Sequence, residues 1–120
     1  MEGSVLVMQK MVKILFILFA FGISSILHAE NLYIFTSSWC RPCQMLKKFM
    51  MEHPKEFIDY DVSTIDIDKF PEFRKKYSVK SVPTTILLID GVEKDRLVGY
   101  SNSSTYKNWL KKWIKNDKSN

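Results

Sequence analysis

The sequence predicts an α/β fold in which helices flank a central mixed sheet, in the order βαβαββα. Two segments with strand character alternate with two of helical periodicity, an Asp-Gly turn joins two further strand-like runs, and an amphipathic segment ends the chain. The 120 residues are 46% hydrophobic and 26% charged. This length and composition suit one globular domain and exclude the low hydrophobicity and high charge of a disordered chain.

Residues 1–29 are predicted to stand apart from this domain. Lys10 and Lys13 precede the uncharged apolar run from Ile14 to Leu27, and the segment ends in a small residue. A basic stretch, a short apolar stretch and a small residue are together typical of a secretory signal peptide. The run is short for a bilayer span, which needs about 20 apolar residues, and an uncleaved N-terminal anchor is the alternative interpretation. Both place the domain, residues 30–120, outside the cytoplasm, as a periplasmic or secreted protein.

The first half of the domain is predicted to alternate strands and helices. Leu32 to Thr36 is a short apolar run that suits a buried strand, and Arg41 to Glu52 has the spacing of a helix. Phe57 to Val62 alternates apolar and acidic residues as a strand does, and Lys69 to Tyr77 is expected to form a second helix. The residues expected on the buried faces of these helices are Met45, Leu46, Phe49 and Met50 in the first, and Phe70, Phe73 and Tyr77 in the second.

The second half is predicted to be a β-hairpin followed by a helix. Thr84 to Ile89 is a β-branched apolar run, Asp90-Gly91 is a hairpin turn signal, and Glu93 to Val98 is the expected return strand. Ser103 to Lys115 has the periodicity of an amphipathic helix with lysines on its solvent face. Its expected buried residues are Tyr106, Trp109, Leu110, Trp113 and Ile114.

The charge of the chain does not indicate a nucleic-acid surface. The formal net charge is +5, and residues 1–29 hold two Lys and one Glu, so the remainder carries 16 basic against 12 acidic residues, or +4. The densest lysines are spaced between apolar residues of the last predicted helix. A solvated helix face explains this spacing better than a basic patch with base-stacking aromatic residues, and no nucleic-acid partner is expected.

The two cysteines of the chain, Cys40 and Cys43, form Cys-Arg-Pro-Cys at the predicted strand-to-helix junction. One use of this spacing is half of a zinc site, but tetrahedral zinc needs four ligands and the domain adds only His53 as a soft ligand, so only a dimer would complete the shell. Another is a structural disulfide, although a bridge over so short a loop stabilises a fold by only about 2 kcal/mol. No metal and no cofactor other than the cysteine pair is therefore expected.

The same residues suit thiol-disulfide exchange. Cys40 lies at the start of a predicted helix, where free backbone N–H groups and the helix dipole stabilise a thiolate, and Arg41 adds a positive charge beside it. Pro42 is tolerated in the first helical turn and stiffens the loop. Cys43 is placed to attack a mixed disulfide that Cys40 forms with a substrate. Cys40 and Cys43 are therefore the predicted catalytic residues.

Three motifs show that the sequence resembles the thioredoxin family over nearly all of residues 31–115. The first is Trp39-Cys40-Arg41-Pro42-Cys43, the second is Ser81-Val82-Pro83-Thr84, and the third pairs Gly91 in the hairpin turn with Gly99 after the last strand. The resemblance implies a thioredoxin-like fold, a cis Pro83 that packs against the dithiol, and a backbone at Val82 that pairs with an incoming substrate strand. The candidate substrate-binding residues are Trp39, Arg41, Pro42, Val82 and Pro83.

Two departures from the family pattern concern catalysis and size. Thioredoxins carry a buried Asp six residues before the first cysteine and a Lys on the neighbouring strand, where this chain has Ile34 and Thr64. The usual proton relay is therefore absent, and no general base is assigned. The domain also begins one strand and one helix short of a full thioredoxin, which makes it closer to the minimal core.

The resemblance leaves three functions open. The favoured one is an extracytoplasmic reductant that reduces protein disulfides and draws electrons from a membrane donor, since the segment Arg96 to Tyr100 and the helix after it are similar to the C-terminal domain of the membrane disulfide reductase. The second is an oxidase or isomerase that donates disulfides. The third is a non-catalytic module that binds a partner by strand pairing. The expected partners are protein thiols and disulfides, with the membrane contacted only through residues 1–29 if these are not cleaved.

Overall fold

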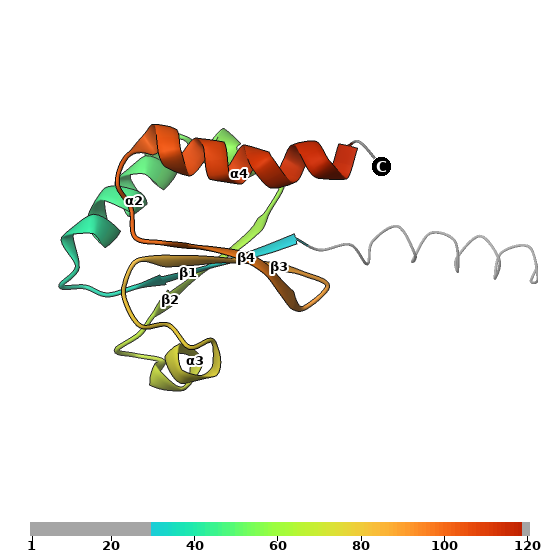
Figure 1. Cartoon of the computed structure of the whole chain (residues 1–120). Coiled ribbons are helices and arrows are strands. Elements are labelled where there is room, and N and C mark those ends of the chain that lie inside the picture. Colours follow the sequence, from blue (N-terminus) through green and yellow to red (C-terminus); the bar gives the residue numbers. More distant parts are fainter. Residues whose placement is uncertain (1–29, 119–120) are drawn as a thin grey trace, which may run out of the picture.

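The computed structural model describes residues 30–118, so the predicted signal peptide or anchor lies outside the described residues (Figure 1). The predicted βαβαββα order is confirmed, with one added turn of 3-10 helix. The elements are β1 (Glu30–Thr36), α2 (Arg41–Glu52), η1 (Pro54–Phe57), β2 (Asp61–Asp66), α3 (Pro71–Lys76), β3 (Thr84–Ile89), β4 (Val92–Val98) and α4 (Ser103–Lys118).

The four strands form one mixed sheet in the order β2-β1-β3-β4. Strand β1 pairs parallel with β2, which α2 and η1 connect to it, and antiparallel with β3. A tight turn joins β3 to β4, and both of its central residues have positive φ, 53° at Asp90 and 79° at Gly91. Two-residue hairpin turns favour this backbone conformation, which explains why the Asp-Gly signal located the hairpin correctly.

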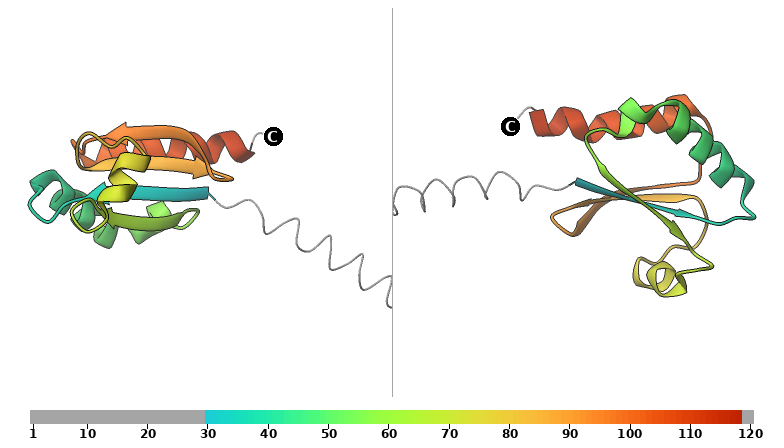
Figure 2. Two further views of the ribbon diagram at one scale, coloured as in Figure 1. Left: turned by 90° about the horizontal axis from the view of Figure 1, so that it is seen from below. Right: turned by 180° about the vertical axis from the view of Figure 1, so that it is seen from behind.

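Helices cover the sheet unequally on its two faces. Helices α2 and α4 lie together on one face and the short α3 lies on the other, as the views from the front and from behind agree (Figure 2). The larger core cluster lies between the sheet and the α2 and α4 side, and its fully buried members include Leu32, Leu46, Leu87, Tyr106 and Leu110. The face that carries α3 holds a second cluster of Phe35, Ile67, Val79, Ile86 and Leu88. Because α2 begins soon after β1 ends, the N-terminus of α2 lies at the end of the sheet where β1 finishes (Figure 1).

The strand predicted at Phe57 to Val62 exists, but its predicted bounds are wrong. Phe57 closes the 3-10 turn η1, and the strand begins four residues later at Asp61. Pro54 starts this turn, and the Phe57 ring packs 5.8 Å from that of Phe49 and 6.0 Å from that of Tyr106. An alternation of apolar and acidic residues is compatible with a turn as well as with a strand. The strand begins at Asp61 because pairing with β1 begins there.

Smaller differences concern the predicted helix faces and ends. Helix α3 is shorter than predicted because Pro71, which suits a first helical position, begins it, and both Phe70 and Phe73 are exposed. In α2 the side chain of Met45 is 49% exposed, whereas Cys43 joins Leu46 and Phe49 on the buried face. Helix α4 continues to Lys118, and of its five predicted core residues Tyr106 and Leu110 are fully buried while the other three pack at the margin of the core.

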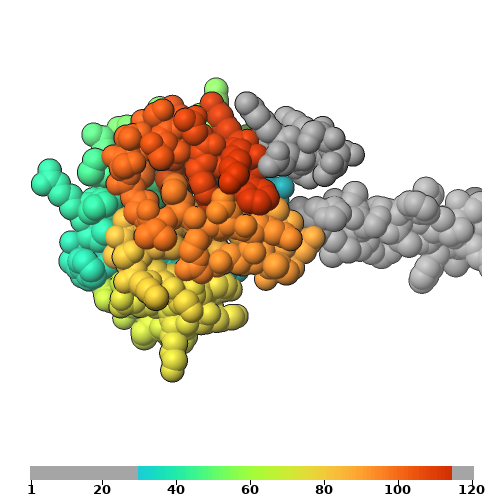
Figure 3. Space-filling view, viewed as in Figure 1, coloured from blue at the N-terminus to red at the C-terminus, as the bar shows by residue number. Residues whose placement is uncertain are grey.

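Asp95 joins the last strand to the last helix, which rest against each other in the space-filling view (Figure 3). Its Oδ2 accepts hydrogen bonds from Nε1 of Trp109 at 2.9 Å and of Trp113 at 3.0 Å, and Nζ of Lys112 lies 3.5 Å from it. The Arg96 amide donates to Oδ1 at 2.8 Å. Partial burial alone would raise the pKa of Asp95, but the hydrogen bonds from Trp113 and the Arg96 amide, the Lys112 charge and the bond from Trp109 together lower it.

Replacing Asp95 with Ala is expected to lower the free energy of unfolding by about 1–2 kcal/mol at neutral pH, because two indole N–H groups lose a charged acceptor. Since the pKa of Asp95 is lower in the folded state than in the unfolded state, its stabilisation is present above the unfolded value of about 4 and is lost as the pH falls through the folded value. Denaturant unfolding of the wild type and of Asp95→Ala would measure this effect, and the difference between their free energies of unfolding should be smaller at about pH 3 than at neutral pH. The exposed neighbour Lys94 provides a control, and an equal loss in Lys94→Ala would contradict the assignment.

Candidate functional site

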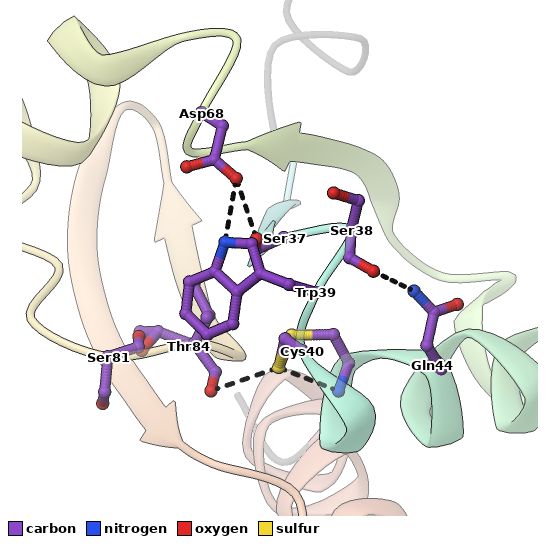
Figure 4. Close-up of a disulfide and its surroundings, with 10 residues drawn as sticks. Ser37, Ser38, Trp39, Cys40, Gln44, Asp68, Ser81 and Thr84 are labelled. Carbon is purple, nitrogen blue, oxygen red and sulfur yellow. Dashed lines mark hydrogen bonds between the residues drawn. A yellow bond between two sulfur atoms is a disulfide. The ribbon is translucent and has the colours of Figure 1, made fainter.

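The two cysteines are joined as a disulfide at the start of α2 (Figure 4). Strand β1 ends at Thr36, and a short turn, in which the Cys40 amide donates to the Ser37 carbonyl at 3.4 Å, leads into the helix. Cys40 has extended backbone angles and forms the N-cap, and Pro42 stands in the first turn. The Cα atoms of Cys40 and Cys43 are 5.2 Å apart, a separation ordinary for a disulfide. The predicted pair thus lies in contact, at the predicted junction.

The two sulfurs differ in accessibility. Cys40 is 5% exposed and Cys43 is completely buried, so Cys40 is the cysteine that a partner molecule can approach more readily. The backbone N–H of Cys43 points to Cys40 Sγ at 3.2 Å. After reduction this N–H and the positive end of the helix dipole would stabilise a thiolate at Cys40. Arg41 is exposed in the same turn and adds positive charge to the neighbourhood.

The loop before β3 lies directly against the disulfide. The Val82–Pro83 peptide bond is cis, and the carbonyl oxygen of Val82 lies 3.5 Å from Cys40 Sγ. Two hydrogen bonds hold this loop, one from the Gly99 amide to the Pro83 carbonyl at 2.7 Å and one from Thr84 Oγ1 to the Ser81 carbonyl at 2.7 Å. The segment 42 residues beyond Cys40 is therefore brought to its sulfur and fixed there by both β3 and the end of β4.

Trp39 covers the other side of the site. Its side chain is 71% exposed, and its Nε1 donates to Oδ2 of Asp68 at 3.1 Å. The same oxygen accepts from Ser37 Oγ at 2.8 Å, so one carboxylate ties the indole to the end of β1 (Figure 4). An exposed indole held in this way presents a flat apolar surface beside the disulfide.

Asp68 is a site residue that the sequence analysis missed. It lies 29 residues from Trp39 along the chain, in the loop after β2, so no local pattern connects the two. Asp66 shapes this loop, because its Oδ1 accepts from the amides of Asp68 at 2.9 Å and Lys69 at 3.4 Å. An Asp followed by polar residues at the end of a strand indicates such a turn, but its pairing with Trp39 follows only from the tertiary structure.

The position of the family's buried Asp belongs to the apolar core in this chain. Ile34 is 0% exposed and lies in the larger core cluster. Its Cα partner on β2 is Thr64, so the two departures noted in the sequence face one another across neighbouring strands. The structure thus shows no carboxylate at the place where thioredoxins hold their proton acceptor.

Residues 30–118 contain neither a metal-binding cluster nor a membrane-spanning helix. Within this range no group of three or more His, Cys, Asp and Glu side chains is arranged to hold a metal ion. No helix among the described residues has the length and apolar character needed to cross a bilayer.

Comparisons with known proteins agree with this geometry. The family model described as Thioredoxin matches residues 23–112. A thioredoxin from Rickettsia bellii is 37% identical over 84 residues, which cover 69% of this chain and 76% of that protein. A thioredoxin H-type protein of Oryza sativa subsp. indica is 37% identical over 65 residues, or 54% of this chain and 53% of that protein, so the match spans about half the length of this relative.

Solved structures give the same result. A mutant thioredoxin from Halobacterium salinarum superposes with a TM-score of 0.61 at 32% identity, covering 69% of this chain and 73% of that one. Fasciola hepatica thioredoxin superposes with a TM-score of 0.63 at 27% identity, covering 70% and 80%. Since the family model matches residues 23–112, three quarters of the 120 residues, and the fold and the Cys-x-x-Cys disulfide agree with it, the chain belongs to the thioredoxin family.

Proposed function

We propose that the protein is a thiol-disulfide oxidoreductase that acts through Cys40 and Cys43. The observation that carries this proposal is the asymmetric disulfide, in which Cys40 reaches the surface beside Trp39 and Val82 while Cys43 is buried behind it. A disulfide that served stability alone would have no need of this accessible sulfur, and its four-residue loop would contribute only about 2 kcal/mol.

The reaction consists of two exchanges. In the reduced protein the Cys40 thiolate attacks one sulfur of a substrate disulfide, so that a mixed disulfide forms and the other substrate sulfur leaves as a thiolate. Cys43 then loses its proton to solvent or to the departing thiolate and attacks Cys40 Sγ. This second step forms the Cys40–Cys43 disulfide and releases the remaining substrate sulfur. Two electrons pass from the dithiol to the substrate, and the reverse sequence donates a disulfide.

The loop at Val82 supplies a means of holding a polypeptide substrate. The Val82 carbonyl oxygen lies 3.5 Å from Cys40 Sγ, just before the start of β3. An extended substrate segment that paired with Ser81 and Val82 would bring its own sulfur beside Cys40, and main-chain hydrogen bonds of this kind place few demands on the substrate's sequence. Protein thiols and disulfides are therefore the proposed partners, with Trp39, Arg41, Pro42, Val82 and Pro83 as the contact surface.

We further propose that the protein works as a reductant outside the cytoplasm, supplied with electrons by a membrane protein. The basic and apolar character of residues 1–29 supports the location. Within residues 30–118, only η1, β2 and the six-residue α3 separate α2 from β3, and this compact connection lacks the inserted helical domain of the main bacterial oxidant. The proposed direction of electron flow rests also on the resemblance, expected from the sequence, of residues 96–100 to the C-terminal domain of the membrane disulfide reductase.

The reduction potential of the Cys40–Cys43 pair tests the proposed direction. The purified protein would be equilibrated against glutathione or dithiothreitol buffers and the fraction of free thiol measured by alkylation. A reduction potential of about −270 mV, as in thioredoxins, would support the proposed role as a reductant, whereas a potential of about −120 mV would identify a disulfide donor. If the Cys40–Cys43 pair exchanged with neither buffer, the proposed oxidoreductase function would be contradicted.

A further inference from the structure

A groove lies between α2 and the start of α4. Its base is formed by Met45, Phe49 and Tyr100, and its rim by Lys48, Glu52 and His53. The groove encloses about 310 Å³. This volume is at the lower end of the range for ligand pockets, so it suits a single side chain better than a whole small molecule. We call it the α2–α4 groove.

The α2–α4 groove lies close to the active-site surface. Tyr100 directly follows Gly99, whose amide donates to the Pro83 carbonyl at 2.7 Å, so one wall of the groove is a single residue away from the loop that touches Cys40. On its other wall, Met45 stands five residues after Cys40, which is about 7.5 Å along the helix axis. A polypeptide bound with its sulfur at Cys40 therefore has this groove within reach of its neighbouring side chains.

The base of the groove is apolar and firmly held. The ring of Tyr100 packs 6.2 Å from that of Phe49 and 5.8 Å from that of Tyr106, which anchors it to the core. Partial burial, together with the nearby Glu52 carboxylate, raises the pKa of Tyr100, so its hydroxyl stays neutral. Met45 is 49% exposed, whereas Leu46 and Phe49 of the same helix are buried. Methionine is flexible and polarisable, and it contacts aromatic rings favourably.

The rim adds little charge selectivity. Lys48 and Glu52 lie opposite in charge, 3.9 Å apart, and both are well exposed to solvent. Their charges offset one another, so this pair gives a charged substrate side chain little to gain by entering. Tyr100 also lines a second hollow of about 220 Å³, together with residues of the segment from Leu97 to Asn102. The chemistry of this surface therefore favours a large apolar or aromatic side chain.

We propose that the α2–α4 groove is a specificity site, which receives an aromatic or large apolar side chain of the substrate polypeptide close to its reactive cysteine. This inference rests on the proposed oxidoreductase function and adds to it a preference among substrates. Strand pairing at Val82 would accept most sequences, and the groove would then distinguish among them by apolar burial.

The test uses synthetic peptides in which one cysteine is joined as a mixed disulfide to thionitrobenzoate. Each peptide places Phe at a different position near the cysteine, and the reference peptide has Ala throughout. Reduced protein attacks the peptide sulfur, and release of the coloured thiol reports the rate of a single turnover. One Phe position is expected to react about tenfold faster than the Ala reference, a factor that corresponds to about 1.4 kcal/mol.

Two matched variants locate the preference. Met45→Glu places a carboxylate in the groove and is expected to remove most of the tenfold preference. Met51→Glu adds the same charge to the same helix, at a side chain that is 82% exposed and outside the groove, and should keep the preference. Both sites are solvent-exposed, and thermal unfolding would verify that both variants fold.

The outcomes separate this proposal from the one on which it rests. Wild-type protein that fails to reduce even bis(2-hydroxyethyl) disulfide would contradict the oxidoreductase function. Protein that reduces this small disulfide but shows no preference for any Phe position would overturn the groove alone. An unchanged preference in Met45→Glu, or an equal loss in Met51→Glu, would also overturn it, whereas a preference lost only in Met45→Glu would establish it.

Discussion

Replacing Cys40 with Ser is expected to lower the rate of disulfide reduction by at least about 1,000-fold, because a serine hydroxyl cannot replace the thiolate that attacks the substrate. Cys43→Ser should lose turnover as well, but for a different reason. Cys40 of this variant still attacks the substrate and forms the mixed disulfide. The mixed disulfide then persists, because the buried residue 43 no longer carries a thiol that can displace the substrate. Turnover of a model disulfide, followed by spectroscopy, would measure the first loss, and non-reducing electrophoresis would show the trapped complex in the second.

The two cysteine variants are controls for one another. Each removes the same disulfide, and hence the same stabilisation of about 2 kcal/mol, so a difference between them reports chemistry and not folding. Covalent complexes with substrate proteins should accumulate with Cys43→Ser and be absent with Cys40→Ser. If Cys40→Ser kept its partners and its cellular role, the protein would be a non-catalytic module that binds by strand pairing.

Replacing Ile34 with Asp is expected to lower the free energy of unfolding by about 3–5 kcal/mol at neutral pH, because this side chain is completely buried and a carboxylate there would be unpaired. Burial would raise the pKa of the introduced carboxyl in the folded state relative to the unfolded value of about 4. The folded state would then bind more protons, so the penalty should be smallest near pH 4 and grow as the pH rises. Urea unfolding across this range would measure it.

The matched control for this substitution is Ile34→Asn, which has nearly the same shape as Asp and no charge. Ile34→Asn should also be less stable than the wild type, but the difference between their free energies of unfolding should not change with pH between about 4 and 8. The register of the sheet allows a further test, since Thr64 is the Cα partner of Ile34 on β2. Adding Thr64→Lys to Ile34→Asp should recover part of the lost stability by supplying a cation. Equal stability of Ile34→Asp and wild type at neutral pH would refute the burial argument.

Much of the fold could be predicted because its signals are local. The hairpin was located by a β-branched run and an Asp-Gly turn, and β3 matches its predicted bounds from Thr84 to Ile89. Helix α2 likewise has its predicted bounds, since Arg41 follows the N-cap cysteine and His53 and Pro54 close it. Periodicity failed where one pattern suited two structures, as at Phe57, whose turn depends on aromatic contacts with Phe49 and Tyr106.

The candidate site divides in the same way. The sequence by itself determined the adjacent cysteines, the helix start that favours a thiolate and the motif at Val82 and Pro83, because each is a property of a few consecutive residues. Only the tertiary structure decided that Asp68 holds Trp39 and that Tyr100 and Met45 line one groove. These relations join residues of different elements, and the pairing of strands and the packing of helices on the sheet set their distances, which no local pattern encodes.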